Sequence, residues 1–383
     1  MTTPMTHRER VLTALSHREP DRVPMDLGST RCTSIHVAGY ERLKAHFGVE
    51  AENIITDRIM QPVVVDERIL QRLDVDTRGV FLGSPDDSRD AQLTPTRWRD
   101  EWGVVREQPA GSYYYDLVES PLAGEITIHD IVNYPWPNPA DPGRTRGLRE
   151  RVREMRTNTD CAVVLNMASG TVHIAQYLRG FQNWFTDLLL EPKLAEALLD
   201  AILEVNMEIV ARALPLVGDE VDVVFAGDDV GHQNSPLVSP DLYRKFIKPR
   251  HKRYFDLVHS LTKAKVLYHS CGDVYPLMGD LVEIGIDAIT PVQVTARDME
   301  PARLKKEFGD EMVFWGAVDS HRVLPWGTAD DVRREVELRI RELGPGGGYV
   351  VDAVHNIQPD VPPENIIAMY EHARQVGRYP LSL

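Results

Sequence analysis

The chain has 383 residues, of which 43% are hydrophobic and 26% are charged, as is typical of a globular protein with a large core. Aspartate and glutamate (58 residues) outnumber lysine and arginine (43 residues), so the formal net charge is −15. Such an acidic balance argues against nucleic acid as the main partner, because phosphate binding requires a basic patch.

The three cysteines are too few for a disulfide framework and indicate a reducing compartment. The first 24 residues are polar and charged, without the apolar core of a signal peptide. No stretch reaches the roughly 18 apolar residues that a membrane helix needs. We therefore expect a cytoplasmic protein with no membrane partner.

The first quarter of the chain predicts a short helix, a short strand and a second helix. Residues 6–17 form an amphipathic pattern that begins with a candidate capping box at Thr6 and Glu9. Pro20 ends this helix, a strand is expected at 23–27, and the second helix at 35–47. Residues 83–142 are rich in aromatic residues and prolines, and we interpret them as an irregular excursion near the mouth of a barrel.

From residue 160 onward, short apolar runs alternate with longer helical patterns. The runs predict strands at 162–167, 221–226, 266–268, 288–292, 313–318 and 349–354. The helical patterns cover 193–214, 239–262, 276–284, 300–308, 328–343 and 362–376. This rhythm is typical of parallel strands joined by helical crossovers.

The predicted fold class is α/β, with residues 1–383 forming a single (β/α)8 TIM barrel. The strand at 23–27, together with one more at 54–60 or in the aromatic-rich region, would complete the count of eight. A doubly wound open sheet is the second interpretation.

Polar residues follow the predicted strands at the points where a barrel carries its chemistry. His269 and Cys271 follow one strand and His355 follows another. Residues i and i+2 of a strand share a face, with Cα atoms roughly 6.5 Å apart, so an imidazole and a thiol can reach one ion. Zinc favours such nitrogen and sulfur ligands, and three of them leave a catalytic position open. The alternative is a histidine that caps a strand beside a buried structural cysteine.

Asp228 and Asp229 follow the strand at 221–226 and point in opposite directions if the strand continues. One of them can face the pocket as a catalytic acid or base, while the other binds backbone or caps a turn. The candidate substrate-binding residues are Gln233, in the same loop as the two aspartates, and Gln293, Arg31 and Asn356, near the ends of other predicted strands.

Several segments together resemble the uroporphyrinogen decarboxylase superfamily, a family of single (β/α)8 barrels. They are THRERVLTALSHREPDRVPMDLG, DEWGVV, SPDLYRKFIKPRHKR, HSCGDVYPLMGDLVEIGIDAITPVQ and PPENIIAMYE. The porphyrinogen decarboxylases hold an acidic tetrapyrrole with clustered arginines, whereas the matching region here offers only Arg31. A substrate with several carboxylates would meet too little positive charge.

The chain looks closer to the zinc-dependent corrinoid methyltransferase branch of that superfamily. Its pattern is His-x-Cys followed by a third thiolate shortly before a P-x-E-N helix start. His269 and Cys271 match the first part, while His355 stands at the later cysteine position. The resemblance therefore implies zinc held by His269, Cys271 and His355, one ion per chain.

The implied activity is methyl transfer between a corrinoid and a thiol, or O-demethylation of a small methoxylated substrate with zinc as Lewis acid. Asp229 or Asp228 would protonate or position the reacting atom. The sequence has no DxHxxG segment of a corrinoid-binding module, so the corrinoid would come on a separate protein or free in solution. A homodimer remains open. The rivals are a metal-independent decarboxylase and a non-catalytic corrinoid-binding or ligand-binding barrel.

Overall fold

A sheet of seven parallel strands forms the centre of the computed structural model, which describes residues 4–382. The spatial order is β1-β6-β7-β10-β11-β12-β13. Six strands lie where the sequence predicts them, which confirms the α/β class. The strands are β1 (Thr77–Phe81), β6 (Ala162–Asn166), β7 (Val223–Gly227), β10 (Lys265–His269), β11 (Ala288–Thr290), β12 (Val313–Val318) and β13 (Tyr349–Ala353).

The remaining strand, β1, does not lie where we expected it. Residues 54–60 form a loop in which Ile55 makes an isolated bridge to Val63, so the strand prediction there is wrong. The aromatic-rich region does contain strands, but they belong to a separate antiparallel sheet. β1 contains Arg78 and Gly79 and therefore lacks the continuous apolar run by which buried parallel strands are recognised.

The segment expected as a strand at 23–27 bonds to both edges of the seven-stranded sheet. Val351 N donates to Pro24 O (2.8 Å) and Asp26 N donates to Val351 O (2.9 Å), next to β13. On the other side, Asp76 N donates to Met25 O (2.9 Å), just before β1. Pro24 has no N–H to donate, which keeps this pairing to isolated bridges.

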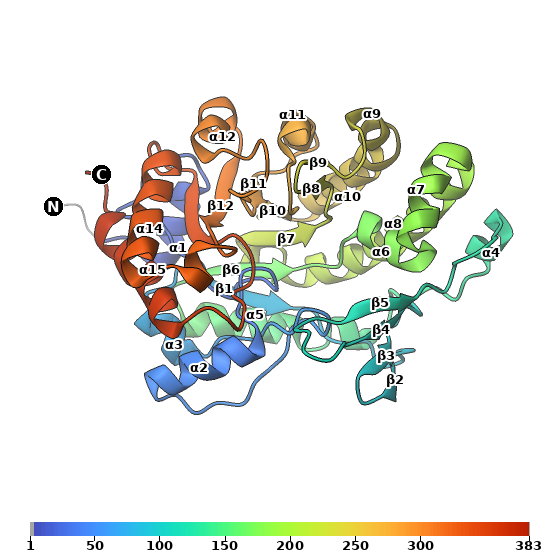
Figure 1. Ribbon diagram of the computed structural model, residues 1–383, viewed down its shortest axis with the longest axis horizontal. Coiled ribbons are helices and arrows are strands. Elements are labelled where there is room, and N and C mark those ends of the chain that lie inside the picture. The colour runs from blue at the N-terminus through green and yellow to red at the C-terminus, as the bar shows by residue number, and fades with distance from the viewer. Residues whose placement is uncertain (1–3, 383) are drawn as a thin grey trace.

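Helices surround the sheet (Figure 1). The longer ones are α1 (His7–Ala14), α2 (Val37–Phe47), α5 (Leu148–Asn158), α6 (Thr171–Arg179), α7 (Phe181–Leu190), α8 (Pro192–Val217), α10 (Lys248–Leu261), α12 (Pro301–Phe308), α14 (Ala329–Leu343) and α15 (Pro363–Val376). The shorter ones are α3 (Glu67–Arg72), α4 (Ile128–Val132), α9 (Pro240–Leu242), α11 (Met278–Glu283) and α13 (Val323–Trp326).

The helix predicted at 239–262 is interrupted. A π-helical turn at Tyr243–Ile247 separates α9 from α10. Pro249, in the first turn of α10, cannot donate the backbone hydrogen bond of a continuous helix, and this accounts for the break.

The interior of the curled sheet is filled by side chains that alternate along its strands. Leu267, Trp315 and Val350 belong to this buried cluster, together with Val11 of α1 and Leu15, which directly follows that helix. Because α1 contacts the residues of β1, β6 and β13, it covers one end of the sheet. The loops that follow the strands lie at the other end of the sheet.

A four-stranded antiparallel sheet lies within residues 83–142, apart from the central strands in Figure 1. Its strands are β2 (Ala91–Thr94), β3 (Arg97–Arg99), β4 (Val105–Glu107) and β5 (Asp116–Glu119). Over residues 4–382, no helix combines the length and the apolar character needed to traverse a lipid bilayer.

Asp76 ties the amino-terminal part of the chain to the sheet. Its fully buried carboxylate pairs with Arg10 Nη1 (2.6 Å) and with Arg22 Nη1 (2.7 Å). It also accepts a hydrogen bond from Met25 N (2.7 Å). This carboxylate therefore links two buried guanidinium groups beside the segment that bonds to β1. Each of these groups also pairs with a second aspartate, Asp21 at Arg10 (2.6 Å) and Asp74 at Arg22 (2.9 Å).

We expect Asp76→Asn to lower the free energy of unfolding by about 1.5–3 kcal/mol, because each of two buried guanidinium groups loses one of its two carboxylate partners. Arg10 keeps its pair with Asp21, and Arg22 keeps its pair with Asp74. Chemical denaturation monitored by circular dichroism measures the loss. Asp256→Asn is the control: it breaks the exposed Lys252–Asp256 pair and should cost about 0.5 kcal/mol or less. An equal loss of unfolding free energy in the two variants would contradict the stabilising role assigned to Asp76.

Candidate functional site

His269 stands at the carboxyl end of β10, where it is 7% exposed. Leu267, two residues earlier, packs in the sheet interior, so His269 lies on the same inner face. Gly227 of β7 is its register partner, and a Cβ at that position would lie 2.6 Å from His269 Cβ. The missing side chain at 227 is therefore what makes room for the imidazole.

Donor atoms of four other residues gather around His269. Cys271 Sγ lies 3.6 Å from His269 Nε2, and an oxygen of Asp229 lies 3.6 Å from the same nitrogen. Ligands of one tetrahedral zinc ion lie roughly 3.3–3.8 Å apart, given bonds of about 2.0–2.3 Å. Cys32 and His355 form a second group with His269, whose ligand atoms all lie within 4.8 Å of one another.

The three predicted metal ligands are thus brought to one place but divided between two groups. His269 belongs to both groups, while Cys271 lies with Asp229 and His355 lies with Cys32. Among the residues 4–382, His269 Nδ1 is a buried nitrogen without a hydrogen-bond partner. A buried imidazole with an unsatisfied nitrogen, surrounded by thiols and a second imidazole, fits a soft or borderline divalent cation such as zinc.

Burial keeps these donors uncharged. It lowers the pKa of His269 to about 3, lowers the pKa of His355, and raises the pKa of Cys271 well above its usual value. The imidazoles therefore have free electron pairs at neutral pH, whereas the thiol stays protonated unless a cation stabilises its thiolate.

The two candidate catalytic aspartates have different surroundings. Asp228 is buried and accepts hydrogen bonds from Val172 N (2.6 Å) and His173 N (2.9 Å), at the start of α6. Asp229 faces the donor cluster: one oxygen accepts from Cys271 N (2.7 Å), and the other lies 3.1 Å from His173 Nε2. Asp228 therefore anchors a helix, and Asp229 is the carboxylate beside the donors.

His173 and Asp229 form a charged couple. Burial opposes a positive charge on His173, but the neighbouring carboxylates of Asp229 and Asp228 outweigh it and raise the pKa of His173 well above 6.5. Burial likewise opposes the negative charge of Asp229, and His173 outweighs it and lowers the pKa of Asp229. The couple places an imidazolium and a carboxylate directly beside neutral metal-type donors.

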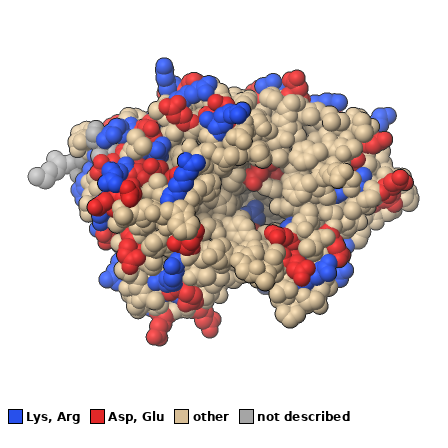
Figure 2. Space-filling model, viewed as in Figure 1, with Lys and Arg blue, Asp and Glu red and all other residues tan. Residues whose placement is uncertain are grey.

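The predicted substrate-binding residues differ in their contacts with the rest of the protein. Arg31 is partly exposed, and its guanidinium lies 3.7 Å from an Asp57 oxygen. Gln293 is buried; it accepts from Gly272 N (2.7 Å) and donates to Gln233 Oε1 (3.0 Å). These two glutamines brace the loop after Cys271. Figure 2 shows that this face of the molecule is hollowed near its centre, where the tips of β6 and β7 lie in Figure 1.

Asn356, the fourth of these residues, connects His355 to the antiparallel sheet. Its Oδ1 is hydrogen-bonded to His355 Nδ1 and accepts from Tyr114 OH (2.9 Å). Tyr114 lies between β4 and β5, so the segment 83–142 reaches the end of β13. A hydrogen bond at Nδ1 orients the ring and directs its other nitrogen to a ligand.

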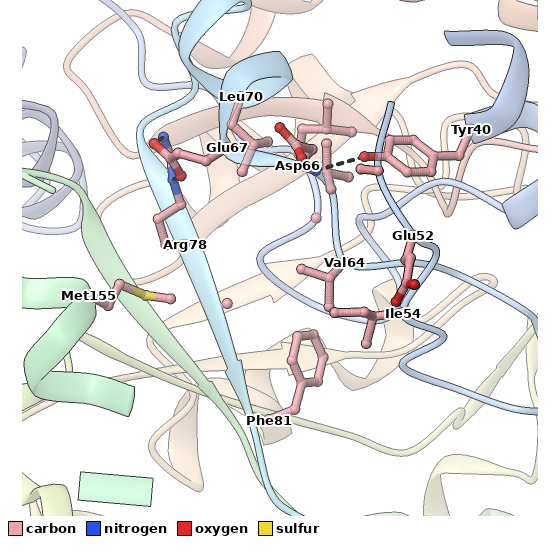
Figure 3. A pocket seen from close by; sticks show the side chains of 15 residues that line it. Tyr40, Glu52, Ile54, Val64, Asp66, Glu67, Leu70, Arg78, Phe81 and Met155 are labelled. Carbon is pink, nitrogen blue, oxygen red and sulfur yellow. Dashed lines mark hydrogen bonds and ion pairs between the residues drawn. The ribbon is translucent and has the colours of Figure 1, made fainter. Parts of the chain in front are cut away.

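A second cavity, of about 280 Å³, lies elsewhere (Figure 3). Its lining is mainly apolar and includes Tyr40, Leu70 and Phe81. The one arginine there, Arg78, is paired with Glu67 at 2.7 Å. Neither His269 nor any of the four donors around it lines this cavity, so it is separate from the donor cluster.

Sequence reasoning missed Cys32 and His173. Cys32 lies in a loop more than 200 residues from His269, next to a segment too short to be a regular strand. His173 lies in the first turn of α6, after Gly170, which is a signal for a helix start and not for chemistry. The one feature of the sequence that pointed to Cys32 and His173 as functional residues was their position shortly after predicted strands.

Comparison with known proteins identifies the class to which this fold and site belong. Residues 118–376 match the family model described as uroporphyrinogen decarboxylase (URO-D). The chain belongs to this family, whose members include both methyltransferases and decarboxylases.

Its relatives include both a methyltransferase and a decarboxylase. The methylcobamide:CoM methyltransferase MtaA of Methanosarcina barkeri is 27% identical over 57% of this chain and 59% of the relative. The uroporphyrinogen decarboxylase of Chlorobium phaeobacteroides is 24% identical over 48% of this chain and 50% of its own length. The chain thus spans between half and three fifths of these relatives. A methyltransferase structure from Methanosarcina mazei has the same fold, with a TM-score of 0.64 and 19% identity over 97% of this chain and 99% of that one.

His173 gives a pH-dependent prediction for the metal-free protein. Because its pKa is higher in the folded state, its charge stabilises the fold fully below about pH 6.5, and the contribution is lost as the pH rises through the folded-state pKa. His173→Gln should therefore be less stable than the wild type at pH 7, with the difference narrowing only under alkaline conditions. Urea unfolding over a pH series measures the stability of both proteins. Equal stability of His173→Gln and the wild type at pH 7 would contradict the prediction.

If His355 holds zinc, Tyr114→Phe should weaken the binding by about 10–100-fold, because the phenol no longer holds the amide that orients His355. Tyr113→Phe is the matched control, since this neighbouring tyrosine is largely exposed and its ring packs against His36. Competition with a chromogenic chelator gives both affinities. Identical affinities would show that the Tyr114–Asn356 contact does not orient His355.

Proposed function

We propose that this protein is a zinc-dependent methyltransferase that moves a methyl group between a corrinoid and a small thiol, or removes it from a small methoxylated substrate. The observation that carries the proposal is the convergence of nitrogen and sulfur donors on His269 at the carboxyl end of β10. A catalytic zinc site needs such donors beside an accessible space. The similarity to a methylcobamide:CoM methyltransferase supports the same reaction class.

His269, Cys271 and His355 would hold the metal in this proposal. When bound, zinc supplies the positive charge that keeps a coordinated thiol deprotonated near neutral pH, or that polarises an ether oxygen. Asp229 faces this position and, fixed by His173 at 3.1 Å, orients the reacting sulfur or oxygen. Arg31, partly exposed beside the cluster, can contact an acidic group of the substrate.

The corrinoid is proposed to be a substrate presented by a separate protein or free in solution. A metal-independent decarboxylase is the weaker alternative, because it would have to anchor a carboxylate substrate with cationic side chains. The two cationic groups near the cluster, Arg31 and His173, already face Asp57 and Asp229. A second alternative, a non-catalytic ligand-binding barrel, predicts corrinoid binding without turnover.

The architecture proposed for this activity is a single domain of residues 1–383 forming one (β/α)8 barrel. The segment at 23–27 would be the eighth strand, because its backbone bonds to both β13 and the residue before β1. The segment 83–142 would then be an excursion at the mouth of the barrel.

The purified protein is expected to contain one zinc ion per chain and to demethylate methylcobalamin when a thiol is supplied. His269→Ala and Cys271→Ala should lose both the metal and the activity. His259→Ala is the control, because this exposed histidine only bonds Gly285 O (2.8 Å). Elemental analysis and the visible spectrum of the corrinoid give the two readouts. A wild-type protein without stoichiometric zinc, or a His269→Ala variant that keeps it, would overturn the proposal.

A further inference from the structure

We propose that Cys32 is a ligand of this metal and supplies a second thiolate from the amino-terminal part of the chain. The inference rests on the proposed function, since it presumes a cation at His269. Cys32, His269 and His355 each offer a ligand atom, and these atoms all lie within 4.8 Å of one another. The full donor set would then be two imidazoles and two thiolates.

The loop that carries Cys32 is fixed by hydrogen bonds. Cys32 N donates to Thr30 Oγ1 (3.1 Å), and Thr30 N donates to Thr33 Oγ1 (3.0 Å). Gly28 N donates to Thr33 O (2.8 Å), which closes the loop at its base. A donor held in this way is preorganised for binding and does not need to be recruited from a mobile segment.

The side chain of Cys32 is buried, 6% exposed, on top of the residues that fill the sheet interior. The other buried cysteine, Cys161, donates from Sγ to Val75 O (3.7 Å). Cys32 Sγ has no such partner among residues 4–382. His269 Nδ1 is likewise buried without a partner among these residues, so both side chains keep bonding capacity that a cation can use.

Charge balance also favours a second thiolate. A divalent cation held by two imidazoles and one thiolate keeps a net positive charge in a buried site, which is costly. Asp229 does not remove that charge alone, because its carboxylate is already paired with the His173 imidazolium. Ionised Cys32 brings the donor set and a divalent cation to neutrality.

A site with four protein donors has its tetrahedral shell filled. A substrate thiol would displace Cys32 from the cation and give its proton to the released Cys32 thiolate, so that one coordinated thiolate would replace another and the charge of the site would not change. Cys32 is thus assigned to the resting state of the metal site.

Cobalt(II) in place of zinc gives a direct test, because the thiolate-to-cobalt charge-transfer band grows with the number of sulfur ligands. Cys32→Ser should lose about half of the band of the wild type, since one of two thiolates is gone. Cys161→Ser, the matched control, should keep the whole band. A Cys32→Ser band equal to that of the wild type would overturn the role of Cys32 while leaving the metal site in place.

X-ray absorption at the zinc edge of the wild-type protein keeps the test independent of whether Cys32→Ser folds. The sample is kept reduced with a phosphine, so that no added thiol enters the count. Two sulfur neighbours per zinc support the inference, and one sulfur neighbour overturns it. A wild-type protein that binds neither zinc nor cobalt defeats the proposed function together with this inference, and so the two failures are distinguishable.

Discussion

The close approach of β7 and β10 at Gly227 determines the rest of the site. Because position 227 has no side chain, the His269 ring can turn inward at the end of its strand and remain almost completely buried. Every other feature is arranged around that ring: the sulfur of Cys271 on one side, the His355 group on another, and the Asp229 carboxylate facing both. An alanine at 227 would push against His269 and the backbone behind it.

The site keeps two electrostatic environments side by side. The thiols and imidazoles are neutral because burial disfavours their charged forms, while His173 and Asp229 are both charged because each stabilises the other. A cation in the neutral half would convert thiols to thiolates, and it would also help to keep Asp229 ionised, because one oxygen of this carboxylate lies 3.6 Å from His269 Nε2. This separation allows a metal to bind in a pocket that already contains an ion pair.

The sequence predicts the strands of the second half well, because a buried parallel strand has a continuous apolar pattern. β12 (Val313–Val318) has the bounds that the sequence indicates. β1 was not recognised, since Arg78 and Gly79 interrupt its pattern and only tertiary pairing with β6 makes it a strand. The donors that follow predicted strands, such as Cys271, were found for the same reason. Cys32 and His173 were not, because their proximity to His269 is created by chain topology, which local patterns do not encode.

The family model begins at residue 118, yet the preceding residues complete the structure. They contribute the segment between β13 and β1, the helix α1 that covers one end of the sheet, and the two arginines paired with Asp76. A recombinant fragment cut at the family boundary would therefore expose the interior of the curled sheet to solvent and lack β1, one of its edge strands. Expression strategies and domain-shuffling experiments with this protein must keep its amino-terminal third, although the match to the family does not extend into it.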